Sequence, residues 1–384
     1  MKKQIYNTIL FISIIFFCFP QQLIAQDSLT VNILLKHIQD QQIRHDAFFM
    51  NGIFPSYISK KKNYTEQRKD NNVFYTALIL YTLKTLKPKL SVTNQSIADS
   101  IVNRSEKSLA KFKNNRGRES YNYWRTDSAY KFPFIRWIRL VKKNILADDP
   151  DCTSICLLAL DTPDSIAQKA HTVMKDYAND TQHPTVSTYS KYKHYAAYSG
   201  WLWQNMPVVF DVCVLNNILT FVQIYNLQWT KVDSASLSLV IAILNNKEYL
   251  SNPISVSPYY GSTSVILYHL ARLMSIKPIP ALDAMKYKFV NEALKLLQQT
   301  NNGFEKIILS NALLKWGVKA QLPDYRNIQE IEKNNFPFVI ANMPSFAGFL
   351  IQKTLTKRGI GLFYYYCPAY NDVLLLENLV LRNE

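Results

Sequence analysis

The sequence predicts an all-α protein with the architecture of an α/α toroid, in which about six helical hairpins place apolar helices inside and amphipathic helices outside. The chain of 384 residues is 48% hydrophobic and 13% aromatic, which is ample for a large packed core. Apolar segments alternate along it with amphipathic ones. The sequence contains only 9 Gly, compared with 16 Pro, so few glycines are available to form tight hairpins or Gly-rich phosphate-binding loops.

The first 25 residues have the pattern of a secretory signal peptide. Lys2 and Lys3 precede an apolar run over residues 9–19, and Leu23-Ile24-Ala25 follows before Gln26. We therefore expect residues 26–384 to fold as a single domain in the periplasm or outside the cell. An uncleaved membrane anchor is the alternative, because the apolar run is long.

Six strongly apolar segments are the predicted inner helices. They begin near residues 72, 152, 211, 262, 305 and 372. Amphipathic helices are expected over residues 29–48, 97–112, 165–177, 234–245 and 283–298, whereas residues 324–357 have no clear pattern. Six helices that are apolar on every side must pack against one another to be buried, and a single four-helix bundle cannot accommodate all six. A closed ring satisfies them and leaves a cavity where they begin; open superhelical stacking is the alternative.

Polar residues precede several of these apolar segments. Such side chains accept hydrogen bonds from the free amides of a helix N-terminus. The candidates are Asp70, Asp211, Ser262, Asp372 and the acidic turn Asp148-Asp149-Pro150-Asp151. Helix capping therefore explains Asp149 and Asp151 without any chemistry, although the additional acids Asp148 and Asp149 distinguish this turn from the others.

The turn Asp149-Pro150-Asp151-Cys152-Thr153-Ser154, followed by the apolar residues 155–160, resembles the Asp-x-Asp-Asp-Thr-Ala turn and inner helix of squalene and hopene cyclases. These enzymes belong to the terpenoid cyclase and protein prenyltransferase superfamily of α/α toroids. The resemblance implies that Asp151 is the proton donor and Asp149 a flanking acid. Such a carboxyl, kept protonated by burial, would start a carbocation reaction in an aromatic cavity. Cys152 replaces an acid of the family's turn.

The cyclase-like interpretation also predicts the residues that contact a ligand. A small molecule, a lipid or a glycan would lie in the central cavity near the starts of the inner helices. The predicted binding residues are polar or aromatic and belong to those starts or to the loops before them: Trp124, Asp211, Asn216, Tyr259, Tyr260 and Asp372.

Two further interpretations remain open. The prenyltransferase branch of the superfamily implies a zinc site, for which Asp211, Cys213 and His269 have the right order; no other cofactor is expected. An exported toroid that binds or degrades glycans would use aromatic platforms and paired carboxylates, such as Asp151 opposite Asp211 or Asp372. Its platforms would be Trp124, Tyr130, Trp201, Trp203, Tyr259 and Tyr260. A cyclase-like protein without catalytic activity, with a binding or structural role, is the third possibility.

The charge and the cysteines limit the partners. The formal net charge is +16, but its densest cluster, formed by Lys60-Lys61-Lys62 with Arg68 and Lys69, belongs to a predicted loop. No basic helix interleaved with aromatic residues indicates nucleic acid. The basic charge favours a solvated surface, and an anionic substrate or an anionic surface such as a membrane is the alternative partner. The four cysteines beyond the leader lie in or beside apolar segments, which predicts buried thiols and no disulfide scaffold.

Overall fold

The computed structural model describes residues 30–62, 66–128, 132–134, 147–320 and 336–384. The predicted signal peptide and Tyr130 lie outside these residues. Helices make up 57% and strands 7%, so the predicted all-α character is confirmed as a mostly helical fold. No helix in the described ranges is long and apolar enough to cross a membrane.

The six predicted apolar helices are present and start within a few residues of the expected positions. They are α2 (Phe74–Leu86), α4 (Pro150–Leu160), α6 (Val212–Ile224), α10 (Thr263–Met274), α13 (Gly303–Lys315) and α16 (Pro368–Arg382). Residues 150–159 of α4 and residues 212–223 of α6 are buried without interruption. A helix that is apolar on all sides can be stable only inside such a core.

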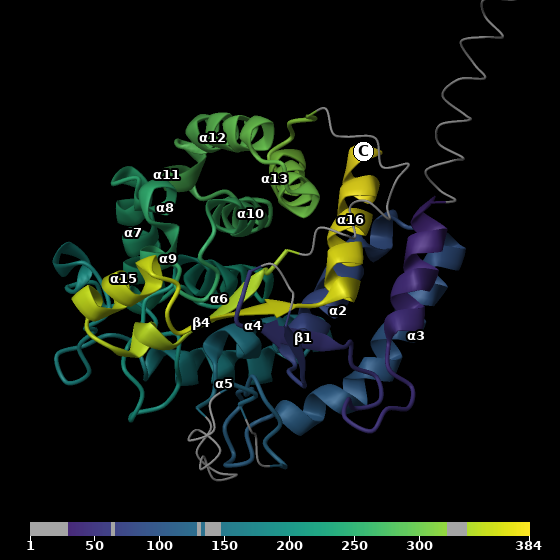
Figure 1. Cartoon of the computed structure of the whole chain (residues 1–384), viewed down its shortest axis with the longest axis horizontal. Helices are drawn as coiled ribbons and strands as arrows, with labels where there is room; N and C mark the ends of the chain where they lie inside the picture. Colours follow the sequence, from purple (N-terminus) through teal and green to yellow (C-terminus); the bar gives the residue numbers. More distant parts are fainter. Residues whose placement is uncertain (1–29, 63–65, 129–131, 135–146, 321–335) are drawn as a thin grey trace, which may run out of the picture.

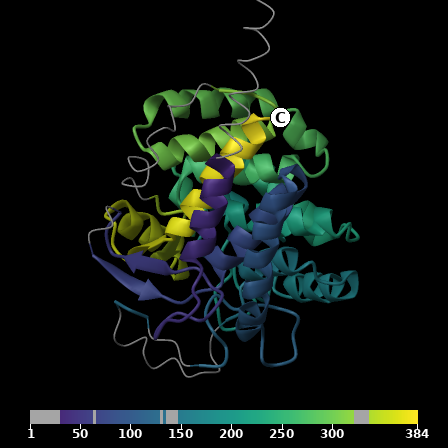
Figure 2. The ribbon, with the colours of Figure 1, turned by 90° about the vertical axis from the view of Figure 1, so that its right-hand side faces the viewer.

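These six helices pack in sequence, each against the next. Helix α2 contacts α4, α4 contacts α6, α6 contacts α10, α10 contacts α13, α13 contacts α16, and α16 returns to α2 (Figure 1). The amphipathic helices pack outside them: α3 (Val92–Leu109) on α2, α5 (Asp164–Lys175) on α4, α7 (Lys231–Asn245) on α6, and α12 (Lys286–Gln299) on α10 and α13. Figure 2 shows α12 and α13 stacked at the end of the molecule opposite the chain's strands.

A four-stranded antiparallel sheet, which the sequence did not predict, joins the two ends of the chain. Its strands are β1 (Ser56–Ser59), β2 (Gln67–Asp70), β3 (Val339–Asn342) and β4 (Leu362–Tyr366), in the order β2-β1-β4-β3. Tyr57 of β1 faces Tyr366 of β4, across about three hundred residues of sequence. Strands of four or five residues give little periodic signal, and their pairing depends on the helices that bring them together.

The structure corrects several local predictions. The first helix is helical from residue 30 and ends at residue 41, so the predicted segment over residues 29–48 was too long. Asp70 ends strand β2 and does not cap α2. Asn72 takes that role instead, since its Oδ1 accepts a hydrogen bond from the amide of Phe74 at 3.1 Å. Ser262 precedes α10 without a capping hydrogen bond, and Asp372 lies within α16.

The described part of the chain also contains shorter α-helices. They are α8 (Glu248–Ser251), α9 (Pro253–Val256), α11 (Pro280–Asp283) and α15 (Phe349–Lys357). The four cysteines of the described chain, Cys152, Cys156, Cys213 and Cys367, are free and buried, which confirms the prediction of buried thiols.

Candidate functional site

A cavity of about 460 Å³ lies where the apolar helices begin, as the sequence predicted. Phe74, Val214 and the acidic turn come from the starts of α2, α6 and α4, and strand β3 forms another wall. Apart from Asp149, Asp151 and Asn342, the lining side chains are apolar or aromatic, or are glycine. The described lining therefore resembles a site for an apolar ligand, with few polar groups to orient it.

Asp149 caps α4 and borders the cavity. Its Oδ1 accepts hydrogen bonds from the amides of Asp151 at 2.7 Å and Cys152 at 3.1 Å, and Pro150 at the first helical position needs no donor partner. Burial and the charge of Asp151 raise the pKa of Asp149 to about 8, against the effect of the capping amides.

Asp151 is not a cap. It is 6% exposed, and its carboxylate accepts hydrogen bonds from the hydroxyl of Tyr260 and from Nδ2 of Asn217, which belong to two other parts of the chain. Burial raises its pKa to about 6, while these two hydrogen bonds and the Arg272 guanidinium oppose the rise. The carboxylate is thus fixed by tertiary contacts beside an aromatic cavity.

Asn217 and Arg272 connect this acid to the interior between the helices. The guanidinium of Arg272 on α10 donates to Oδ1 of Asn217 on α6, whose amide donates to Asp151. All three side chains are buried, and Arg272 also lies near the rings of Tyr81 and Tyr268. Neither Asn217 nor Arg272 was predicted from the sequence as a site residue. The feature of the sequence that distinguishes these two residues is that each is polar and lies within a helix that is mostly apolar.

Aromatic side chains form much of the wall. The indole of Trp201 donates to the hydroxyl of Tyr259 at 2.7 Å, and the two rings meet edge to face at 5.9 Å. Trp124 donates to Asp70 at 3.2 Å and packs edge to face on Tyr123. The predicted binding residues Trp124, Tyr259 and Tyr260 therefore line the same cavity as the acidic pair.

Three other predicted binding residues lie outside the cavity lining. Asp211 caps α6 through the amides of Cys213 and Val214 and also accepts from Ser257 and from the Tyr259 amide, so it positions the loop that carries Tyr259. Burial raises its pKa to about 7. Asn216 is buried in α6, and its side chain has no hydrogen-bond partner among the residues that the structure describes. Asp372 contacts Gln41 at 2.5 Å and His37 at 3.2 Å, which attaches the first helix to α16.

The described residues do not support the alternative of a zinc site. Within the described residues, no group of three or more His, Cys, Asp or Glu side chains is placed to hold a metal ion. Nδ1 of His269 lies 2.8 Å from the carbonyl of Val265, and burial lowers the pKa of this imidazole. Its ring packs against Tyr260 and Phe338. Among the proposed sugar platforms, Trp203 lies beneath the guanidinium of Arg116, at 4.3 Å, and borders no part of this cavity.

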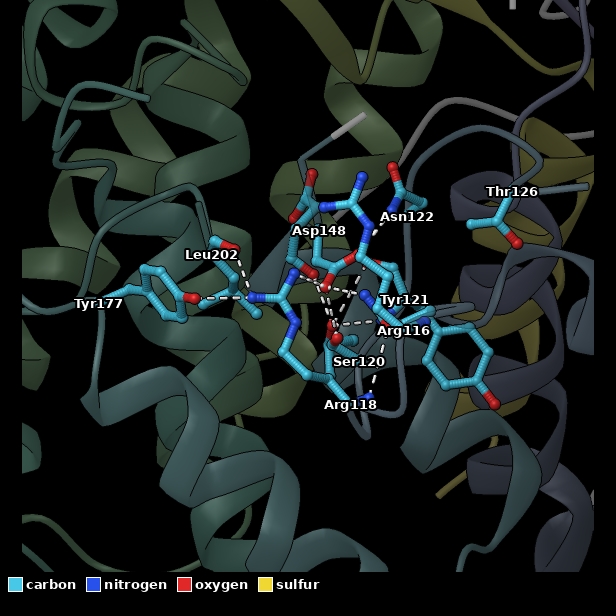
Figure 3. Close-up of polar contacts among 12 residues, drawn as sticks. Arg116, Arg118, Ser120, Tyr121, Asn122, Thr126, Asp148, Tyr177 and Leu202 are labelled. Carbon is cyan, nitrogen blue, oxygen red and sulfur yellow. Dashed lines mark hydrogen bonds and ion pairs between the residues drawn. The ribbon is translucent and has the colours of Figure 1, made fainter. Parts of the chain in front are cut away.

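Asp148, the third acid of the turn, anchors the segment that carries the other two (Figure 3). Its buried carboxylate accepts hydrogen bonds from Asn114, Ser120 and Asn122 at 2.6–2.7 Å and forms an ion pair with Arg118 at 2.7 Å. Arg118 in turn donates to the Tyr177 hydroxyl and the Leu202 carbonyl. This fully paired carboxylate has no free face for a ligand, so its role is structural.

Fold and site together define a mostly helical protein with an apolar cavity that is bordered by one buried acid, Asp151, and one half-buried acid, Asp149. Comparison of the chain with protein-family models, with curated proteins and with solved structures found no match. The residues of the site therefore provide the argument for function.

Proposed function

We propose that this protein is a cyclase-like α/α toroid that binds an apolar, unsaturated small molecule in the cavity and isomerises or cyclises it after protonation by Asp151. The closed succession of contacts from α2 through α16 and back to α2 supports the toroid. Export through residues 1–25 and contact with a membrane surface, from which such a ligand would be taken, belong to the same proposal.

The observation that carries the proposal is the placement of two neighbouring carboxyls in an apolar, aromatic wall. To protonate an alkene, an acid must keep its proton near neutral pH, and a pKa near the working pH favours transfer. Burial raises the pKa of both Asp149 and Asp151, and the charge of Asp151 raises that of Asp149 further. With pKa values of about 8 for Asp149 and about 6 for Asp151, Asp149 holds the pair's proton at neutral pH and would pass it to Asp151, which Tyr260 and Asn217 orient toward the alkene. The carbocation would then lose a proton to the ionised pair, which restores the acid.

The aromatic wall supplies the second requirement. A carbocation in an apolar cavity needs stabilisation that does not capture it, and the faces of aromatic rings provide this through cation–π attraction. Phe74, Tyr123, Trp124 and Trp201 border the cavity that Asp151 borders. A glycan would instead need several hydrogen-bonding partners, which this wall offers at few positions, so we do not favour a sugar as the ligand.

Deuterium transfer tests the proposal directly. The protein is incubated in D₂O with acyclic and monocyclic isoprenoid alkenes dispersed in detergent, and deuterium in recovered alkenes is measured by mass spectrometry. We expect deuterated, isomerised products, and a loss of about a hundredfold or more in Asp151→Asn, the range typical of a general acid. Asp372→Asn is the matched control, because Asp372 is also a buried acid but lies outside the cavity lining and contacts Gln41 and His37 of the first helix.

Two results would refute the chemistry. If deuterium enters the products equally in Asp151→Asn and in the unsubstituted protein, Asp151 is not the donor. If alkenes bind without gaining deuterium, the protein is a carrier or a binding protein, which is the non-catalytic alternative.

A further inference from the structure

Asn342 is the amide of the described cavity wall, which also contains the unpaired hydroxyl of Tyr123, and the proposed chemistry uses neither polar group. It ends strand β3, is 2% exposed and lines the cavity. Neither Nδ2 nor Oδ1 of its side chain has a hydrogen-bond partner in the described structure. The Ser345 hydroxyl binds the backbone carbonyl of Asn342, at 2.7 Å, so the side-chain amide does not stabilise this turn.

An unpaired buried amide is costly for the protein. Each buried polar atom without a partner costs about 1–3 kcal/mol relative to its hydrated state, and an apolar side chain would remove that cost. The neighbours of Asn342 in β3, Val339 and Ile340, are apolar and line the same cavity. A residue that adds nothing to local structure and faces a ligand cavity is best explained by a ligand that pairs with it.

The amide also limits what that ligand is. It offers one acceptor and a donor group without net charge, so it matches a hydroxyl or a carbonyl. The described lining contains no Lys, Arg or His to neutralise an anionic head group, and it contains the acids Asp149 and Asp151, which would repel one. A cationic head group would pair with those acids and leave Asn342 without a partner.

We infer that the ligand is an apolar molecule carrying one neutral oxygen group, a hydroxyl or a carbonyl, and that Asn342 binds this group. The inference deepens the proposed function and rests on it for the occupancy of the cavity by an apolar body. It makes Asn342 a specificity-determining residue, which selects an oxygenated substrate over the hydrocarbon of the same length and fixes which end lies near β3.

Competition between matched probes tests the inference. Undecanol and dodecane have the same number of heavy atoms and differ in one hydroxyl; undecylamine and undecanoic acid carry charged head groups. Each is titrated against a fluorescent apolar probe, N-phenyl-naphthylamine, bound to the full protein. We expect undecanol to bind about tenfold more tightly than dodecane, as one additional hydrogen bond provides, and more tightly than the amine or the acid.

Two variants show whether the preference for undecanol depends on Asn342. Asn342→Leu is expected to reduce the preference for the alcohol to twofold or less without weakening dodecane. Gln352→Leu is the matched control, because Gln352 is also a fully buried amide with neither polar atom paired, but it does not line the cavity. Its substitution should leave the tenfold preference intact. Thermal unfolding of both variants checks that they are folded.

The outcomes are separable from those of the proposed function. Equal affinity of the unsubstituted protein for undecanol and dodecane overturns the inference without any variant, and so does a preference that survives in Asn342→Leu or favours the amine or the acid. A retained preference for the alcohol together with no deuterium transfer would sustain the inference while the catalytic proposal fails.

Discussion

Replacing Asp149 by asparagine is expected to change how the stability of the protein depends on pH. The pKa of Asp149 rises from the ordinary value of 3.8 to about 8 on folding, because the carboxyl is buried beside Asp151. Between these values the folded protein holds a proton that the unfolded chain has released, so stability is full below pH 4 and falls as the pH rises. The slope is about 1.4 kcal/mol per pH unit for one such group.

The size of the effect follows from the contacts of Asp149. Asparagine caps a helix as well as aspartate, so Oδ1 can still accept from the amides of Asp151 and Cys152. The substitution therefore removes the titration and retains the cap. Asp151, with a pKa of about 6, still titrates in part of the range above pH 6, so the difference between the two proteins reports the pair of acids rather than Asp149 alone. From pH 6 to pH 7.5, Asp149→Asn should become more stable relative to the unsubstituted protein by about 2 kcal/mol.

Urea unfolding at intervals of half a pH unit, followed by far-ultraviolet circular dichroism, measures this difference. Comparison at each pH cancels the contribution of the other titrating groups, including Asp211. Asp99→Asn is a surface control, because its carboxylate is 46% exposed in an ion pair with Lys87. Parallel stability curves for Asp149→Asn and the unsubstituted protein would show that Asp149 has an ordinary pKa. The proposal that the folded protein keeps a carboxyl protonated near neutral pH would then be refuted.

Two further substitutions test the support around the site. Arg118→Met should lower the free energy of unfolding by about 3 kcal/mol or more, because it leaves the buried Asp148 carboxylate without its counter-charge. Urea unfolding measures this loss. A loss below about 1 kcal/mol would show that the Arg118–Asp148 ion pair does not hold the acidic turn in place. Gly261→Ala should cost more stability than Gly317→Ala by about 1 kcal/mol or less, since the end of the Ile340 side chain must shift to make room. Both glycines have positive φ, but only at Gly261 would the new Cβ lie 2.7 Å from Ile340, so equal losses of melting temperature would contradict this packing.

Local patterns predicted the helices because their causes are local. An apolar residue on every face of a segment requires burial of that segment, and six such segments require one another, whatever their final arrangement. The same local logic was correct for the caps at Asp149 and Asp211, where the side chain reaches amides two and three residues ahead. It was wrong at Asp70 and Asp372, where distant partners bind the carboxylate instead.

The site was predicted only in part. Asp149, Asp151 and the aromatic residues Trp124, Tyr259 and Tyr260 were selected from the sequence and line one cavity. Asn216 was selected for its place near the start of α6, but its neighbour Asn217 faces Asp151, because adjacent positions on a helix point about 100° apart. Without a neighbouring helix in view, the sequence cannot show which of two adjacent asparagines faces the acid.

The sequence by itself determined a mostly helical protein with six buried helices and an acidic turn at the start of one of them, because helix formation, capping and burial follow from residues within a few turns of one another. Only the tertiary structure decided that strand β3 and the Trp201 loop cover the helix starts, and that Tyr260 and Asn217 meet Asp151. These contacts join segments far apart in the chain. Their geometry is set by packing of the whole core, and the environment that raises the pKa of Asp151 is a property of that packing.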